Sequence, residues 1–397
     1  MSRFQEGKIG DFLTLQRGFD ITKDQQIGGR IPVISSSGIA SYHNECRAKG
    51  PGVVIGRKGT LGTAFYVKGD YWPHDTSLWV KDFKGNNPEF VYYFLKALPL
   101  EKLDSGSANP TLNRNVVHLL PAKFPRLPEQ ERIAAVLFAL DAKIELNNRI
   151  NVELEGMAKL LYDYWFVQYD FPISAAQAAA MGKPHLEGKP YRASGGKLTH
   201  NETLKREIPQ GWSVSTLSKF ANITMGQSPP GDSYNQEGLG TVFFQGSTDF
   251  GWRFPQVREF TTAPSRLGKK GDILLSVRAP VGTLNIADQD CCIGRGLAAL
   301  NAKTDHDSFL FEVMLYFKTI FDRRNVSGTT FGSITKDDLY SLEFACPPAG
   351  SHLLDAFEEK IEPSHQTILI NHRQNQELTA LRDWLLPMLM NGQVTVG

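Results

Sequence analysis

The sequence has few cysteines and no long apolar run, and each absence excludes a class of protein. Its 397 residues include four cysteines, none of them in a C-x-x-C pair, so neither a zinc site nor a disulfide framework is predicted. Scarce cysteine favours a reducing, cytoplasmic location. No segment approaches the roughly 18 apolar residues of a membrane span, and the N-terminus, MSRFQEGKIGDF, lacks the apolar region of a signal peptide. We therefore expect no membrane association.

Catalytic motifs are also missing. The chain has no G-x-x-x-x-G-K-[ST] phosphate loop, no G-x-G-x-x-G with a following acidic residue, and no H-E-x-x-H or G-x-S-x-G. Glu187-Gly188-Lys189 lacks the further carboxylates with which a nuclease holds Mg²⁺. The tetrapeptide SPPG at 228–231 lacks the aromatic residue that amino-methyltransferases place after the second proline, so we interpret it as a turn. The sequence predicts a non-catalytic protein without a cofactor or metal.

A polar octapeptide of the form N-x-R-x-N-x-E-L occurs twice, at 147–154 and at 371–378. Around each copy, residues recur at alternating steps of four and three, which is the heptad pattern of a coiled coil. The two series, which we call the seams, are related by a shift of 224 positions. They are Ile133, Leu137, Leu140, Ile144, Asn147, Asn151, Leu154, Ala158, Leu161 and Trp165, and Phe357, Ile361, Ser364, Ile368, Asn371, Asn375, Leu378, Arg382, Leu385 and Leu389.

The asparagines in the middle of the seams predict a specific helix pairing. A buried asparagine in a seam costs stability unless it meets a polar partner, so it selects register and partner. We expect Asn147 and Asn151 to face Asn371 and Asn375, which an antiparallel packing satisfies in one alignment. The first helix, from 129 to 166, would be about 57 Å long, and Pro363 predicts a kink or a late start in the second. Two unrelated amphipathic helices are the alternative.

The duplication extends beyond the helices. Segment 105–114 matches 327–336 through S-G-[ST] and [ST]-[LI]-[NT]-[RK], and 49–57 resembles 270–278, each a short apolar strand that ends in Arg before a glycine turn. We predict an α+β tandem duplication of a mixed α/β domain followed by a long helix. The predicted boundaries are 1–126 and 212–348 for the domains, 127–170 and 349–397 for the helices, and 171–211 for a connector with a short helix at 175–181.

Charge is unevenly distributed along the chain, although the net charge is only +1. Residues 1–126 carry 17 Lys and Arg against 11 Asp and Glu, whereas 212–348 carry 13 against 14. The helices are acidic, with 4 against 8 in 127–170 and 3 against 6 in 349–397. This spread fits a protein that confines nucleic-acid contact to particular regions. It fits many proteins that bind no nucleic acid equally well.

Taken together, these motifs resemble the DNA-specificity subunits of type I restriction-modification systems over nearly the whole chain. The resemblance rests on the tandem layout, on L-P-E-Q-x-x-I-A at 127–134, on the I-x-x-N-x-x-x-N seams and on the connector FPISAAQAAAMGKP…GKPY…EIPQGW. The second helix departs from the pattern, because Ser351 and His352 stand where the first has Glu129 and Gln130.

The resemblance implies a function and a set of partners. Each mixed domain would be a target-recognition domain that reads one half of a bipartite, asymmetric site in double-stranded DNA. The helices would form an antiparallel coiled coil that separates the two domains. Two methyltransferase subunits, which carry S-adenosylmethionine, and a motor-nuclease subunit would be the protein partners.

Polar loops beside predicted strands are the candidates for DNA contact. Glycine turns let the backbone approach a flat partner, and a cation beside short hydrogen-bonding side chains suits phosphates and base edges. The candidates are Arg57, Lys58, Thr60, Thr111, Asn113 and Arg114 in the first domain, and Gln227, Ser228, Arg278, Thr329, Thr330, Ser333 and Lys336 in the second.

Two other functions stay open at this point. A structural adaptor would dock protein partners on its duplicated helices without touching DNA, and a self-contained methyltransferase would be an enzyme. The missing cofactor loop argues against the enzyme, and the basic first domain argues weakly against the adaptor. A steep loss of affinity with salt would identify the DNA binder.

Overall fold

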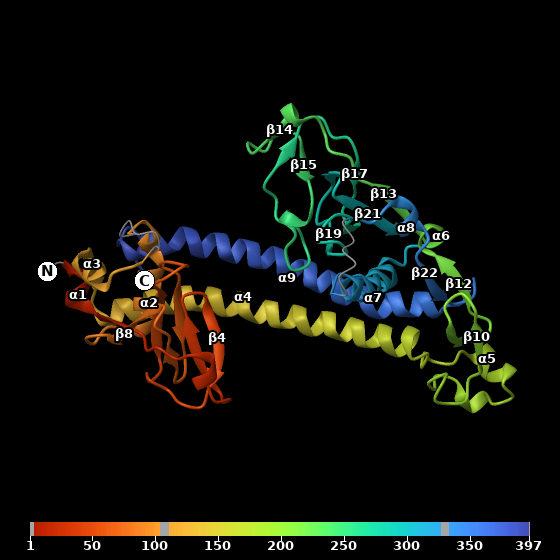
Figure 1. The fold of residues 1–397 in the computed structure, drawn as a ribbon, viewed down its shortest axis with the longest axis horizontal. Helices are drawn as coiled ribbons and strands as arrows, with labels where there is room; N and C mark the ends of the chain where they lie inside the picture. Colours follow the sequence, from red (N-terminus) through yellow and green to blue (C-terminus); the bar gives the residue numbers. More distant parts are fainter. Residues whose placement is uncertain (1–3, 104–110, 327–332, 397) are drawn as a thin grey trace. The chain divides into compact units, whose positions relative to one another are not determined.

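The computed structural model describes residues 4–103, 111–326 and 333–396, and these form two compact units (Figure 1). Unit 1 comprises Met1–Asn148 and His372–Gly397, and unit 2 comprises Arg149–Asn371. Each unit contains one mixed domain together with one part of each of two long helices. Within the described residues, no helix is long and apolar enough to cross a membrane.

The domain of unit 1 is built on a four-stranded antiparallel sheet whose order is β2-β8-β5-β6. Its strand β5 reads GVVIG and is buried throughout, as expected for a strand covered on both faces. Helix α2 packs against this sheet and buries Phe90, Tyr93 and Phe94. The bounds are β2 (Thr14–Arg17), β5 (Gly52–Gly56), β6 (Ala64–Val67), β8 (Ser77–Asp82) and α2 (Pro88–Ala97).

Smaller elements complete this domain. A second sheet has the order β4-β3-β7, with β3 (Ile31–Ser35) parallel to β7 (Trp72–Pro73) and antiparallel to β4 (Gly38–His43). Strand β1 (Phe4–Lys8) pairs with β9 (Pro121–Pro125), which ties the start of the chain to the segment just before the first long helix. The remaining elements are α1 (Ile9–Phe12), η1 (Lys23–Gln25), η2 (Leu100–Lys102) and α3 (Arg114–Leu119).

The domain of unit 2 repeats this plan. Its four-stranded sheet has the order β13-β21-β18-β19, its parallel pair is β15 and β20, and β12 pairs with β22. The bounds are β12 (Ser213–Thr216), α6 (Leu217–Phe220), β13 (Ala221–Met225), η5 (Gly231–Ser233), β14 (Tyr234–Asn235), β15 (Thr241–Phe244), η6 (Ser247–Asp249), β16 (Phe260–Thr261), β17 (Leu267–Gly268), β18 (Ile273–Ser276), β19 (Leu284–Ile286), β20 (Cys291–Ile293), β21 (Leu297–Ala302), α7 (Asp307–Val326), α8 (Lys336–Tyr340) and β22 (Glu343–Cys346). The predicted tandem duplication is confirmed.

The segment between the first long helix and the second domain is folded. It contains α5 (Ala175–Ala180), close to the helix predicted there, η4 (Pro184–Leu186), and a hairpin of β10 (Leu198–Asn201) and β11 (Arg206–Pro209). The Phe171 ring stacks between Tyr191 and Trp212, with centroids 4.7 and 5.3 Å away. The segment therefore belongs to the core of unit 2.

The two long helices are α4 (Leu127–Tyr162), which continues as the π-helix η3 (Asp163–Val167), and α9 (Leu353–Met390). Within each unit, parts of α4 and α9 lie side by side and antiparallel (Figure 1). No position of either seam is exposed, so the predicted coiled coil is confirmed. The alternative of a late start at Pro363 is wrong, because α9 begins upstream of it at Leu353 and Pro363 lies on its exposed side.

The asparagines of the seams meet in pairs. In unit 1, the Asn147 side-chain amide donates to Asn375 Oδ1 at 2.9 Å, and Asn375 donates to Asn148 Oδ1 at 2.8 Å. In unit 2, Asn371 donates to Asn151 Oδ1 at 2.8 Å, and both residues are buried. These hydrogen bonds form in one alignment of the helices, and a register slip would break them.

Replacing Asn371 with leucine is expected to lower the free energy of unfolding by about 1–3 kcal/mol, because the Asn151 amide would stay buried without its partner. The double variant Asn151→Leu with Asn371→Leu should regain most of this loss, since both polar groups are then gone. Urea unfolding of the four proteins in a double-mutant cycle measures the coupling. Additive effects of the two substitutions would contradict the pairing.

In each unit, a side chain of a long helix caps the first turn of a helix in the mixed domain. Gln130 of α4 accepts a hydrogen bond from the Asn87 backbone N–H at 2.9 Å, beside α2. Glu358 of α9 accepts one from the Ser308 N–H at 3.0 Å, in the first turn of α7. First-turn N–H groups lack partners within their own helix. In the second helix, Glu358, six residues beyond His352, thus takes over the capping role that Gln130 has in the first.

Candidate nucleic-acid interface

In unit 1, polar segments that are distant in sequence meet at one edge of the domain. Three of these segments follow β2, β5 and β7, and a fourth precedes α3. Backbone hydrogen bonds of 2.8–2.9 Å join them: Phe19 N–H to Pro73 O, His74 N–H to Ile34 O, Arg57 N–H to Thr76 O, Gly56 N–H to Thr63 O, and Leu112 N–H to Arg57 O. The predicted loops 57–60 and 111–114 therefore lie together, and an isolated β-bridge joins Lys58 to Thr111. We call this meeting of segments the junction.

Unit 2 repeats this junction bond for bond. The corresponding hydrogen bonds of 2.8–3.0 Å are Gln227 N–H to Ile293 O, Gly294 N–H to Phe244 O, Val277 N–H to Gly296 O, Ser276 N–H to Thr283 O, and Ile334 N–H to Val277 O. The bridge between Arg278 and Ser333 takes the place of that between Lys58 and Thr111. The loops predicted from the sequence are again brought together.

The junction corrects the sequence alignment by one residue. The aligned repeats matched Arg57 with Arg278, but the hydrogen bonds show that Arg57 corresponds to Val277 and Lys58 to Arg278. Short apolar strands such as those at 53–55 and 273–275 align almost equally well in neighbouring registers. Their pairing with distant segments decides the register.

A glycine at the same position of both units makes the junction possible. A Cβ atom added to Gly18 would lie 2.1 Å from the His74 carbonyl oxygen, and one added to Gly226 would lie 2.2 Å from that of Gly294. The segment after β2 or β13 can approach its neighbour this closely only because no side chain intervenes.

The edge of unit 1 is organised by the carboxylate of Asp75. Its Oδ2 accepts a hydrogen bond from Arg17 at 2.8 Å and lies 4.0 Å from Lys58 Nζ, while its backbone oxygen accepts one from Arg57 at 3.2 Å. Burial opposes ionisation of Asp75, but the Arg17 hydrogen bond and the charges of His74, Arg17 and Lys58 outweigh it and hold the pKa of Asp75 below its usual value. Asp75 therefore holds several cations at the site.

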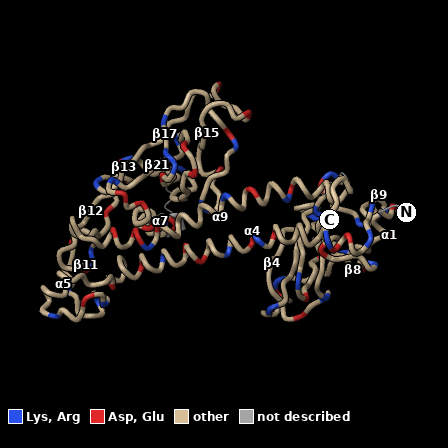
Figure 2. Tube along the Cα trace, turned by 180° about the vertical axis from the view of Figure 1, so that it is seen from behind, with Lys and Arg blue, Asp and Glu red and all other residues tan. Residues whose placement is uncertain are grey.

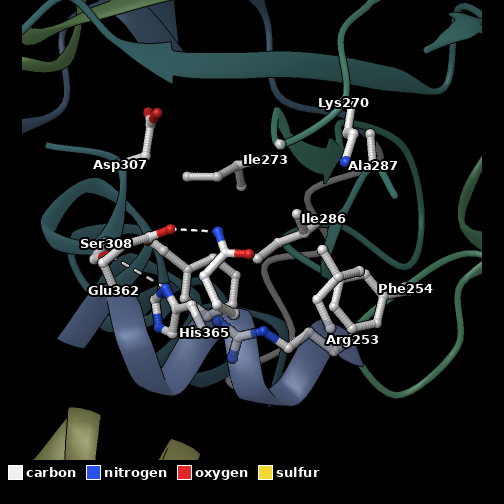
Figure 3. Close-up of a pocket in the computed structure, with 14 residues that line it drawn as sticks. Arg253, Phe254, Lys270, Ile273, Ile286, Ala287, Asp307, Ser308, Glu362 and His365 are labelled. Carbon is white, nitrogen blue, oxygen red and sulfur yellow. Dashed lines mark hydrogen bonds between the residues drawn. The ribbon is translucent and has the colours of Figure 1, made fainter. Parts of the chain in front are cut away.

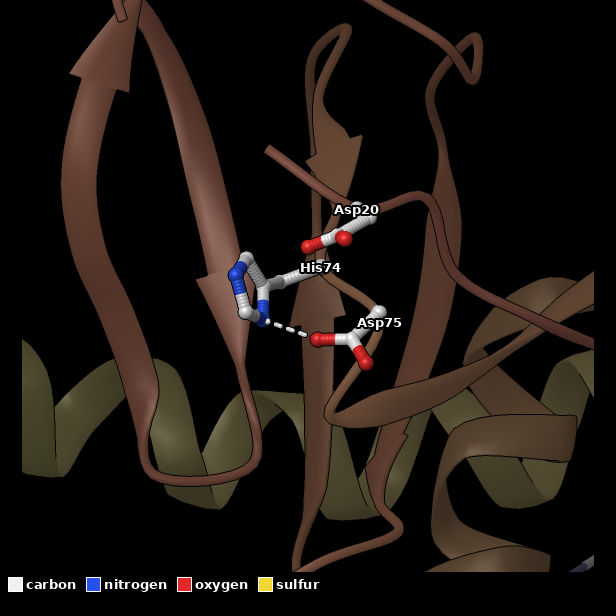
Figure 4. Close-up of side chains that lie close together, drawn as sticks. All are labelled: Asp20, His74 and Asp75. Carbon is white, nitrogen blue, oxygen red and sulfur yellow. Dashed lines mark ion pairs between the residues drawn. The ribbon is translucent and has the colours of Figure 1, made fainter. Parts of the chain in front are cut away.

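Asp20, His74 and Asp75 bring ligand atoms within 4.8 Å of one another (Figure 4). Such a trio can hold a metal ion, but His74 Nδ1 faces Asp75 Oδ1 at 3.2 Å and Arg17 occupies Oδ2. Cations of the chain thus already take up the Asp75 carboxylate. The arrangement fits the positioning of basic side chains better than metal binding.

The edge of unit 2 has a different chemistry. Arg278 and Arg295 line an open pocket of about 450 Å³ together with Gln245, Ser247 and Thr248. The Gln245 amide donates to Ser228 Oγ at 3.0 Å. The same backbone frame therefore presents different polar side chains in the two units.

The predicted contact residues are found as follows. The exposed candidates are Lys58, Thr60, Asn113 and Arg114 in unit 1, and Gln227, Arg278, Ser333 and Lys336 in unit 2. The half-buried candidates are Arg57, Thr111 and Ser228. Asn113 also caps α3 by accepting from the Asn115 N–H at 2.9 Å. Thr329 and Thr330 lie outside the described residues.

Sequence reasoning missed Arg17, Asp75, Gln245 and Arg295. Arg17 precedes the conspicuous Gly18, and Arg295 stands in a Gly-Arg-Gly triplet, so glycine context was a signal for these two. No signal of this kind accompanies Asp75 or Gln245.

A second cavity, of about 260 Å³, lies in unit 2 between the mixed domain and α9 (Figure 3). The Arg253 side chain is 1% exposed there, donates to Glu155 of α4 at 3.1 Å, and lies 4.3 Å from the Phe311 ring centre. Burial raises the pKa of nearby Glu312 to about 8, and burial together with the Arg253 charge lowers the pKa of His365 to about 3. These contacts link the domain to both helices within the unit.

Along the long helices, positive and negative residues are interspersed (Figure 2). Arg382 of α9 pairs with Asp141 of α4 at 2.6 Å, and Asp141 accepts a hydrogen bond from Tyr93 of α2 at 2.7 Å. Charged groups of the helices therefore also tie the domain of unit 1 to its part of the coiled coil.

Known proteins share this sequence and fold. The family model described as the type I restriction modification DNA specificity domain matches residues 1–156 and 209–379. The chain therefore belongs to the type I restriction-modification DNA specificity family.

Two relatives and one solved structure illustrate the match. A protein described as the MjaX type I restriction enzyme specificity subunit of Methanocaldococcus jannaschii is 29% identical over 322 residues, 78% of this chain and 68% of that protein. The HindI specificity subunit of Haemophilus influenzae is 24% identical over 343 residues, 72% and 71% of the two chains. The crystal structure of the S subunit from M. genitalium has a TM-score of 0.65 at 14% identity, covering 98% of this chain and 96% of that one. This last likeness shows the fold alone.

Proposed function

We propose that residues 1–126 and 212–348 are two target-recognition domains that each contact one half of a bipartite, asymmetric site in double-stranded DNA. The duplicated junction carries this proposal. Equivalent backbone hydrogen bonds hold the same loops in both units, while the side chains at the edge differ. A common frame with different polar groups suits two domains that read different bases. The helices 127–170 and 349–397 would hold the domains apart.

The test is selection from a random pool of duplex DNA, using this chain co-purified with its proposed methyltransferase partner. Two short conserved blocks with a fixed gap of unspecified sequence are the expected result. Affinity should fall steeply with salt, because cations at the edges displace counterions from phosphates. No enrichment, or binding that does not depend on salt, would favour the adaptor instead. Methylation by this chain alone would favour the self-contained enzyme.

We also propose that two methyltransferase subunits bind the outer faces of the long helices. Outside the seams, α4 and α9 each carry a pair of exposed apolar side chains three residues apart, and the two pairs, which we call the second series, are again related by 224 positions. Leu160 is 69% exposed and Met157 62%, and their counterparts Trp384 and Leu381 are 56% and 44% exposed. Exposed apolar side chains that adjoin one another on a helix face are typical of interaction surfaces. A surface present in both units fits two copies of one partner, and a motor-nuclease subunit would join them for restriction.

Replacing Leu160 with glutamate is expected to reduce the bound methyltransferase from two copies to one, and Trp384→Glu should do the same in the other unit. A charge at the centre of an apolar contact must be buried without a partner, which opposes binding. Native mass spectrometry of the co-expressed complex measures the stoichiometry. Val152→Glu is the matched control, because Val152 is 57% exposed on α4 but lies outside the second series. Two retained copies in both variants would contradict the proposal.

A further inference from the structure

The two junctions carry opposite charges at one equivalent position. Asp75 follows His74, whose N–H donates to Ile34 O, and Arg295 follows Gly294, whose N–H donates to Phe244 O. The residue after each of them accepts a backbone hydrogen bond. Thr76 O accepts from the Arg57 N–H, and Gly296 O accepts from the Val277 N–H. The residues before and after Asp75 make the same backbone hydrogen bonds as the residues before and after Arg295. Asp75 and Arg295 therefore occupy equivalent positions in the two junctions.

Their neighbours make this difference larger. In unit 1, the Asp75 carboxylate lies 4.0 Å from Lys58. The counterpart of Lys58 is Arg278, so in unit 2 two arginines line the same pocket. Within the described residues, neither of these two guanidinium groups forms an ion pair. The nearby carboxylate of Asp249 is already held by Arg258 at 2.7 Å. Unit 2 thus presents two cationic donors where unit 1 pairs a cation with an anion.

The backbone around Arg295 is tightly packed. A Cβ atom added to Gly294 would lie 2.8 Å from Gln245 Oε1, and one added to Gly296 would lie 2.8 Å from the Gln245 backbone oxygen. The Arg295 N–H also faces Ser228 Oγ at 3.4 Å. A side chain that reads a base needs such a supported backbone, because small displacements abolish a bidentate contact.

We propose that Arg295 is a specificity-determining residue that recognises guanine at one position of the half-site bound by residues 212–348. This inference rests on the proposed function. The guanidinium group offers two parallel N–H donors that match the O6 and N7 acceptors of guanine in the major groove. The open pocket of about 450 Å³ between Arg278, Arg295 and Gln245 gives a base edge access to these donors. Unit 1, with Asp75 at this place, has no equivalent contact.

The test repeats the duplex selection with the complex of the wild type, Arg295→Ala and Arg295→Lys. In the Arg295→Ala complex, the preference for guanine at one position of one half-site should fall about 10-fold, with the other half-site and the gap unchanged. Arg295→Lys should keep more of the overall affinity than alanine, but lose discrimination, because an ammonium group lacks the planar pair of donors. Lys318→Ala, which removes a cation that pairs with Asp322 on α7, is the control and should select the wild-type motif.

The possible outcomes separate this inference from the proposed function. An equal loss of affinity for every sequence would make Arg295 a phosphate contact and overturn the inference. An unchanged motif in Arg295→Ala would overturn it as well. In both cases the wild-type bipartite motif would still support the proposed function. A wild-type complex that selects no bipartite motif would overturn both.

Discussion

Replacing Arg253 with alanine is expected to lower the free energy of unfolding of unit 2 by about 3–5 kcal/mol. The Arg253 guanidinium is almost fully buried, pairs with Glu155 at 3.1 Å and packs over Phe311. Its removal would leave the half-buried Glu155 carboxylate without its cation, and it would open a gap beside Phe311 of α7. Urea unfolding followed by a probe in unit 2 measures the loss.

Arg258 provides the matched control for this substitution. It also forms an ion pair, with Asp249, but its side chain is 53% exposed. Exposed pairs contribute at most about 1 kcal/mol, so Arg258→Ala should unfold at nearly the wild-type urea concentration. Equal losses in the two variants would show that burial of Arg253 does not set its contribution.

Stability of unit 2 is expected to decrease as the pH falls from about 6.5 towards 3, in part because His365 resists protonation. Burial and the Arg253 charge lower its pKa to about 3 in the folded state, whereas the unfolded chain binds the proton near pH 6.5. A folded state that binds fewer protons is stabilised above the unfolded pKa and loses that advantage below it. The full effect would be on the order of 5 kcal/mol.

The variant His365→Asn isolates this contribution. The groups around His365 include Arg253, Glu362 and Ser308, whose Oγ lies 3.2 Å from His365 Nδ1. Glu312 acts in the opposite direction, because burial raises its pKa to about 8 and its contribution is lost as the pH rises from about 4.5 to 8. The free energy of unfolding is measured in urea at pH 4, 5 and 7 for the wild type and the variant. Subtracting one from the other at each pH removes the contribution of Glu312, which both proteins share. The exposed His200→Gln is the control, and parallel curves for wild type and His365→Asn would refute the prediction.

The elements that the sequence predicted best depend on contacts between nearby residues. The seam positions repeat every three or four residues, so the buried face of α4 and of α9 could be derived without knowing the fold. The same holds for α5, which begins with Ser174 capping the Gln177 N–H at 3.2 Å. The asparagines in the seams further restricted which helices could pair.

The candidate interface was only partly predictable. Loops 57–60 and 111–114 were identified, but their contact through Lys58 and Thr111 depends on strands far apart in the chain. Arg57 was matched to Arg278 because repeats align by residue type, whereas strand pairing matches Lys58 to it. Asp75 and Arg295 share no chemistry, so no comparison of residue types could identify them as equivalent.

By itself, the sequence determined the tandem architecture, the two long helices and their antiparallel register, because heptad spacing and buried amides act through residues close in the chain. The tertiary structure decided which polar groups stand together at each edge. It placed Asp75 among cations in one domain and Arg295 beside Arg278 in the other. It also showed that Gln130 and Glu358 cap helices of the mixed domains. These contacts join residues tens of positions apart, and only the folded backbone brings such residues together.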